Sequence, residues 1–180
     1  MRNWRWRPLL YSLLATALAL GIRRWWGELY AIEVAGESMT PAFRPGDFLL
    51  ARRTSLRSGL PRDERACGLV VCAQGPDGRV LLKRIVGVPG DSMRIGAEVQ
   101  VAGRALIEPY AHGETPPAQY RGVHALGPDE YMLLGDHRAA STDSRDFGPV
   151  PASRIEGVAW LRYWPPGRLG RIRREPRRLA

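Results

Sequence analysis

Beyond residue 30, the apolar residues recur in short or alternating runs that glycine and proline interrupt. Alternation with a period of two places successive side chains on opposite faces of a β-strand, and no stripe with helical spacing continues beyond two turns. This pattern predicts an all-β fold. The candidate strands are 30–35, 47–52, 69–74, 79–86, 98–102, 104–108, 131–134 and 155–163.

The segments between the candidate strands carry turn and loop signals. Gly75-Pro76-Asp77-Gly78 predicts a hairpin, and Ala102-Gly103 predicts a second tight turn. Residues 109–128 are rich in proline, glycine and histidine and predict a poorly regular loop. The arginine-rich end, 168–178, has two interpretations: a solvated, frayed tail or a segment that contacts anionic lipid.

The N-terminal region differs from the rest because residues 8–22 carry no charge and are flanked by tryptophans and arginines. The uncharged run spans only about 22 Å as a helix, but Trp4 to Trp26 spans about 34 Å, enough for a hydrocarbon core of about 30 Å. The excess of arginine before the run predicts a single-pass anchor with its N-terminus in the cytoplasm and the remaining chain outside. The alternatives are a signal peptide cleaved near Ala17-Leu18-Ala19 and a buried amphipathic helix.

The formal net charge of +9 suggests an acidic partner, either anionic lipid or nucleic acid. The tryptophan-flanked apolar run favours membrane lipid, so we expect no nucleic-acid partner. Cys67 and Cys72 are five residues apart and would lie on opposite faces of one strand, which disfavours a mutual disulfide unless the chain bends at Gly68. We also expect no metal and no cofactor, because the histidines are scattered along the chain, at His112, His124 and His137.

Lys83 is the only lysine, since the other 26 basic residues are all arginine. Arginine supplies charge and hydrogen bonds equally well, but its guanidinium does not deprotonate, whereas a desolvated lysine can become a neutral base. Period-two spacing places Lys83 beside Leu81 and Ile85 on one strand face, where apolar neighbours lower the pKa of an amine. The pattern therefore indicates a basic amine; the alternative is a lysine retained by chance at a strand edge.

Ser38 is the candidate nucleophile for such a base. It lies in the turn Gly36-Glu37-Ser38-Met39-Thr40-Pro41, and a turn of this kind can aim backbone N–H groups at one point, as an oxyanion hole requires. Thr40 replaces the second glycine of a G-x-S-x-G elbow, which disfavours a triad hydrolase of that type. The serine then needs another base, and Lys83 would supply it in a Ser-Lys mechanism.

Three sequence blocks, in this order and spacing, resemble those of type I signal peptidases: 36–41 followed by Pro45-Gly46-Asp47, then 83–91, then 135–150. The resemblance implies a mostly antiparallel β fold preceded by one transmembrane helix, and a membrane-bound serine endopeptidase. It implies Ser38 as nucleophile and Lys83 as general base. Lysine at this position resembles the bacterial and organellar branch of the family.

The third block supplies the supporting residues that the resemblance implies. Ser141 would hydrogen-bond and orient the Lys83 amine, and Asp143 would pair with Arg145 to hold the loop near the dyad. Gly36 stands where some relatives carry a hydroxyl residue, which leaves the backbone N–H of Ser38 as the main oxyanion donor. The third block also departs from the usual polar residues, at His137, Ala139 and Ala140.

The resemblance also divides the chain into regions and implies a substrate. Residues 1–26 would form the cytoplasmic tip and anchor, 27–165 an extracytoplasmic catalytic β domain with a small cap-like insertion at 92–134, and 166–180 a basic tail. Precursor proteins would bind extended beside a strand edge, in shallow pockets that favour small residues. Cleavage of their N-terminal signal peptides would then follow a small residue, with another small residue two positions earlier.

Three other interpretations remain open. A maturation peptidase of the same family, dedicated to one precursor, would keep the dyad, and the short segment 92–134 favours it. The self-cleaving SOS repressors share Ser-Lys chemistry, but they carry a DNA-binding domain where this chain has its apolar run. A membrane-anchored basic β module without enzymatic activity would leave Lys83 unexplained.

Overall fold

The computed structural model describes residues 28–54, 59–116 and 122–180. The expected anchor at 1–26 lies outside these ranges. Within them, no helix combines the length and the apolar character that crossing a bilayer requires. The described strands are β1 (Leu29–Glu33), β2 (Phe48–Arg53), β3 (Val70–Gln74), β4 (Val80–Gly87), β5 (Ser92–Ile95), β6 (Val99–Val101), β7 (Arg104–Ala105), β8 (Val123–Ala125), β9 (Glu130–Leu134), β10 (Val150–Pro151), β11 (Ile155–Trp164) and β12 (Gly170–Arg171).

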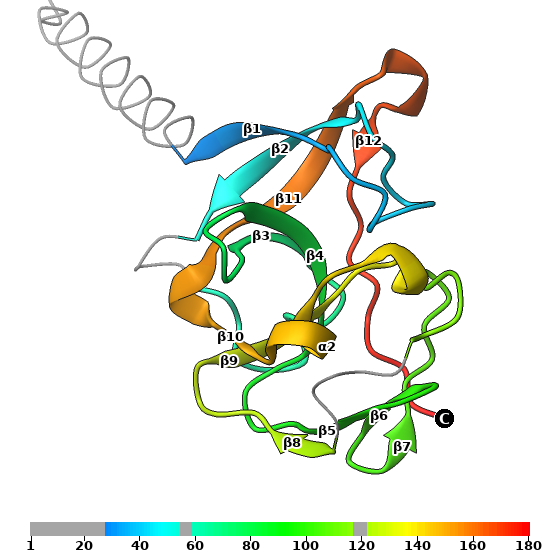
Figure 1. The fold of residues 1–180 in the computed structure, drawn as a ribbon. Coiled ribbons are helices and arrows are strands. Elements are labelled where there is room, and N and C mark those ends of the chain that lie inside the picture. Colours follow the sequence, from blue (N-terminus) through cyan, green and yellow to red (C-terminus); the bar gives the residue numbers. More distant parts are fainter. Residues whose placement is uncertain (1–27, 55–58, 117–121) are drawn as a thin grey trace, which may run out of the picture.

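The strands form two antiparallel sheets. The larger has the order β1-β2-β11-β3-β4-β9-β10, with β12 added beside β11, and it curls strongly (Figure 1). Register shifts in β11 and at the end of β4 mark bulges, which bend a strand and increase its twist. The smaller sheet, β7-β6-β5-β8, lies beyond the end of β4. The predicted mostly antiparallel β fold is confirmed. The small sheet lies within 92–134, the segment expected to be a cap-like insertion, but β9 at the end of that segment belongs to the large sheet.

All eight candidate strands are present, with boundaries that differ by a few residues at most. The structure adds β5, β8, β10 and β12, which have two to four residues each. The expectation of a poorly regular loop over 109–128 was wrong at β8, because that segment gains regular structure by pairing with β5.

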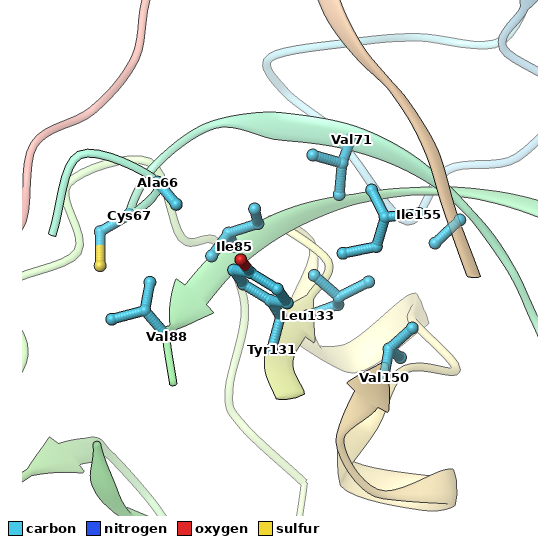
Figure 2. Packing of buried hydrophobic residues seen from close by; sticks show 10 residues of the cluster. Ala66, Cys67, Val71, Ile85, Val88, Tyr131, Leu133, Val150 and Ile155 are labelled. Atoms are coloured by element: carbon cyan, nitrogen blue, oxygen red, sulfur yellow. The ribbon is translucent and has the colours of Figure 1, made fainter. Parts of the chain in front are cut away.

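Two hydrophobic clusters bury both faces of the C-terminal half of β4. Ile85 packs with Tyr131, Leu133 and Ile155 inside the curl of the large sheet (Figure 2). Val86 packs in a second cluster between the large and small sheets, with Met93 and other residues of the small sheet. Because successive side chains enter opposite clusters, Lys83 and Arg84 also point to opposite faces of a buried strand.

Both cysteines are buried free thiols. Burial raises the pKa of Cys67 to about 11 and that of Cys72 to about 12. The thiolate is the reactive form of cysteine, so burial disfavours the reactive form of both side chains.

The interpretation of the C-terminal segment as a solvated, frayed tail was wrong. Strand β12 pairs with β11, the carbonyl of Arg178 accepts a hydrogen bond of 2.9 Å from Ile107, and Arg177 forms an ion pair with Asp91. Leu179 packs against the cluster between the sheets. The arginine-rich composition suggested a solvated segment. In the structure, its side chains and backbone groups instead bond to residues that are distant in the sequence.

Candidate functional site

The turn that carries Ser38 follows β1 and is anchored by the residue after the serine. Met39 is 1% exposed and belongs to a third hydrophobic cluster, whereas Ser38 is only half-buried. Val34 donates to the carbonyl of Asp47 and accepts from Gly46, which closes the loop behind the turn. The buried methionine therefore fixes the backbone while leaving the Ser38 hydroxyl accessible.

Lys83 reaches this turn from β4. Its Nζ lies 2.7 Å from Ser38 Oγ, and this is the only hydrogen bond that the amine makes within the described part of the chain. Lys83 is 4% exposed, and desolvation lowers the pKa of its amine below the usual lysine value, although the Asp143 carboxylate acts in the opposite direction. The arrangement is a serine hydroxyl in direct contact with a buried amine whose pKa is lowered by desolvation.

Asp143 organises the third block. It caps the short helix α2 (Ser144–Phe147) and accepts hydrogen bonds from Arg145 Nε at 2.8 Å and from the Gly135 N–H at 2.9 Å. Burial opposes ionisation of this carboxyl, but the hydrogen bonds from Arg145, Gly135 and Ser141 outweigh it and hold the pKa of Asp143 below its usual range. The expected pair of Asp143 with Arg145 is present, and both side chains are buried.

Ser141 has a different hydrogen-bond partner from the one that the resemblance implied. Its hydroxyl donates to Asp143 Oδ2 at 2.6 Å, and no hydrogen bond to Lys83 occurs among those of the described residues. The third block and the Ser38 turn approach each other closely at Gly135. A Cβ at this position would collide with the Ser141 side chain and the Ser38 carbonyl. The third block thus lies directly against the Ser38 turn.

A cleft of about 180 Å³ adjoins the serine and the lysine. It lies between 32–36 and 80–83, and its lining includes Gly36, Ser38, Lys83 and the buried Cys72. A Cβ at Gly36 would meet no atom within 4 Å, so this position opens into free space. A larger cavity of about 410 Å³ is bordered by Leu29 and Trp160 but by neither Ser38 nor Lys83.

A buried ionic layer beside the site was not predicted from the sequence. Arg84 donates to Asp136 with contacts of 2.8 and 2.6 Å, and its guanidinium lies 4.3 Å from the centre of the Tyr110 ring. Arg138 Nη2 contacts Glu108 Oε1 at 2.6 Å. Arg84 could have indicated this layer, because it is a charged residue next to Lys83 in an otherwise apolar strand. A buried charge needs a partner of opposite charge, so an acidic residue could have been expected nearby.

His137, which the sequence marked only as a departure, contacts the Ser38 turn. Its backbone N–H donates to the Ser38 carbonyl at 3.0 Å, and its ring nitrogen Nδ1 lies 3.1 Å from Thr40 Oγ1.

Within the residues that the structure describes, no group of three or more His, Cys, Asp or Glu side chains is arranged to hold a metal ion.

Comparison with known proteins identifies the family. Residues 5–164 match the family described as "Signal peptidase, peptidase S26". The chain belongs to the signal peptidase family. This confirms the assignment from the three sequence blocks, and the chain is a serine endopeptidase.

Relatives from different organisms share this similarity over most of their length. A signal peptidase I of Leptolyngbya laminosa is 34% identical over 167 residues, which cover 88% of this chain and 79% of the relative. The mitochondrial ATP-independent inner membrane protease subunit 1a of Arabidopsis thaliana is 37% identical over 145 residues, which cover 78% of this chain and 73% of the relative. A solved signal peptidase I from Enterococcus faecalis matches with a TM-score of 0.43 and 24% identity, covering 51% of this chain and 93% of that one.

Proposed function

We propose that this signal peptidase family member removes N-terminal signal peptides from exported precursors, with Ser38 as nucleophile and Lys83 as general base. The observation that carries the proposal is the 2.7 Å contact between the Ser38 hydroxyl and the buried Lys83 amine. A hydroxyl is a weak nucleophile unless a base accepts its proton. A lysine with a lowered pKa can be that base, which arginine cannot.

The reaction would proceed through an acyl-enzyme. Neutral Lys83 accepts the Ser38 proton while Oγ attacks the scissile carbonyl carbon, and the backbone N–H of Ser38 stabilises the developing oxyanion. The Lys83 ammonium then gives its proton to the leaving amine as the peptide bond breaks. A water molecule, deprotonated by Lys83, attacks the ester, and the proton returns to Ser38 as the signal peptide leaves.

Ser141, Asp143 and Arg145 would position this dyad. The Ser141 proton is donated to Asp143, so the hydroxyl lone pairs remain available to accept a hydrogen bond from the Lys83 amine. Asp143, held by Arg145, then fixes the direction in which the Ser141 hydroxyl points. In this proposal the three residues act through Lys83 and do not touch the substrate.

The cleft suits an extended peptide with small side chains. Its volume of about 180 Å³ is less than the range typical of pockets for small molecules, about 300–1,000 Å³. Segments 32–36 and 80–83 would supply main-chain hydrogen bonds to a substrate that lies beside them as an added strand. Small residues at the cleavage site and two positions earlier would therefore be preferred.

Activity should rise with pH, because only the neutral form of Lys83 can accept the Ser38 proton. Since burial lowers the pKa of this amine, the rise should be centred below the usual lysine value of about 10.4. Lys83 is the only lysine, so labelling with ¹³C-lysine gives a single side-chain signal whose titration reports this pKa alone. The NMR midpoint and the rising limb of precursor cleavage should coincide; a normal lysine titration in the active protein would contradict the proposed base.

We further propose that residues 1–26 anchor the protein in the cell membrane, with a single pass and the catalytic domain on the extracytoplasmic side. The tryptophan-flanked apolar run and the excess of N-terminal arginine support this. A C-terminal tag should then be digested by protease added to intact spheroplasts and protected in inverted membrane vesicles. Digestion only when the cytoplasmic face is exposed would reverse the proposed orientation.

A further inference from the structure

The segment from Glu37 to Thr40 forms a closed backbone turn that contains Ser38. The Thr40 hydroxyl donates to the Glu37 carbonyl at 3.0 Å, and the Thr40 backbone N–H reaches the same carbonyl at 3.0 Å. Thr40 thus closes the turn on the C-terminal side of Ser38. Any group that holds Thr40 also restrains the backbone that carries the serine.

The ring of His137 makes such a contact. Thr40 Oγ1 lies 3.1 Å from His137 Nδ1. A carbonyl oxygen can only accept, and a hydroxyl has one proton to donate, so the bond from Thr40 to Glu37 uses that proton. Both bonds are satisfied together only when His137 Nδ1 carries a proton and donates it to Thr40.

The backbone of His137 reinforces this contact, and a neighbouring segment supports the ring. The His137 N–H donates to the carbonyl of Ser38 at 3.0 Å, so ring and backbone hold two residues of one turn. The His112 ring lies at a centroid distance of 5.7 Å from that of His137, and the His112 backbone bonds to both residues that flank His137. The imidazole is therefore held between the Ser38 turn and the segment around His112.

We propose that His137 is a positioning residue, whose Nδ1–H holds Thr40 and thereby fixes the direction of the Ser38 hydroxyl toward Lys83. His137 belongs to the third block, which also carries Ser141 and Asp143, so one loop positions both members of the dyad. The inference rests on the proposed function, because it assigns importance to the orientation of Ser38. It differs from a Ser-His mechanism, in which the imidazole itself would exchange a proton with the serine.

The test uses the full chain and a signal-peptide-bearing precursor. His137→Ala should lower kcat by about tenfold and leave KM nearly unchanged, because a small displacement of a reacting group slows the chemical step. His137→Asn should restore most of the loss, since its side-chain amide can donate from nearly the same place as Nδ1. Asparagine does not titrate, so this rescue separates positioning from acid–base catalysis. His124→Ala, in β8 away from the cleft lining, is the matched histidine control and should keep wild-type activity.

A double-mutant cycle with Thr40→Val isolates the contact itself. Thr40→Val removes the hydroxyl that His137 holds, so adding His137→Ala to it should lower kcat by less than a further twofold. Independent, multiplying losses would overturn the proposal, as would failure of His137→Asn to restore activity in a folded protein. Wild-type and Ser38→Ala proteins run in the same assay separate this outcome from failure of the proposed function, in which Ser38→Ala would stay active.

Discussion

Replacing Lys83 with arginine should lower precursor cleavage on the order of 10³-fold or more, to the level of Ser38→Ala. The substitution keeps a positive charge and a long side chain. A guanidinium stays protonated in proteins and cannot accept the Ser38 proton. The measurement is cleavage of a signal-peptide-bearing precursor by purified protein, with folding verified by thermal melting.

Two further variants define what this result means. Lys83→Met removes the amine without burying a charge, so it should fold at least as well as Lys83→Arg and be equally inactive. If both variants melted like the wild type but were inactive, loss of the base rather than misfolding would explain the effect. If Lys83→Arg kept near wild-type activity while His137→Ala abolished it, a Ser-His hydrolase would replace the proposed mechanism.

Removing the carboxylate of Asp143 should produce the largest loss of stability among these variants. Asp143→Ala should lower the free energy of unfolding by about 3–5 kcal/mol, because it leaves the buried guanidinium of Arg145 without its partner. The Gly135 N–H and the Ser141 hydroxyl lose the same acceptor. Chemical denaturation at neutral pH measures the change, and activity should fall with it because the Ser38 turn lies against this block.

The chain contains a matched control for this prediction. Asp63 pairs with Arg65 at the same sequence spacing as Asp143 with Arg145, but both of its side chains are exposed. Exposed ion pairs contribute little to stability, so Asp63→Ala should leave the denaturation midpoint nearly unchanged. Equal effects of the two substitutions would show that burial of the Asp143 pair does not determine its contribution.

The pH dependence of stability should reflect the same carboxylate. The pKa of Asp143 is lowered in the folded protein, so its contribution is fully present above the unfolded value of about 3.8 and is lost as pH falls through the folded pKa. The lowered pKa of Lys83 has a different consequence. It sets the pH above which the amine is neutral and can act as a base.

Local patterns in the sequence were sufficient to predict the fold class and two central residues. Short apolar or alternating runs between glycine and proline revealed every strand of five or more residues, because a strand alternates when one face is buried and is apolar throughout when both faces are buried. Lys83 was found because a single lysine among arginines indicates chemistry that arginine cannot perform. Ser38 followed from its turn and from the need of such a base for a nucleophile.

Only the tertiary structure decided which distant groups meet. Ser38 and Lys83 are 45 residues apart, and Arg84 and Asp136 are 52 apart; both contacts depend on the curl and register of the large sheet. The hydrogen-bond acceptor of the Ser141 hydroxyl could not be predicted from the sequence, because it depends on where the Asp143 carboxylate lies. The contact between Thr40 and His137 and the packing of the C-terminal segment against the small sheet could not be predicted from the sequence either. Sequence periodicity describes only neighbouring residues, whereas these contacts depend on how distant parts of the chain pack together.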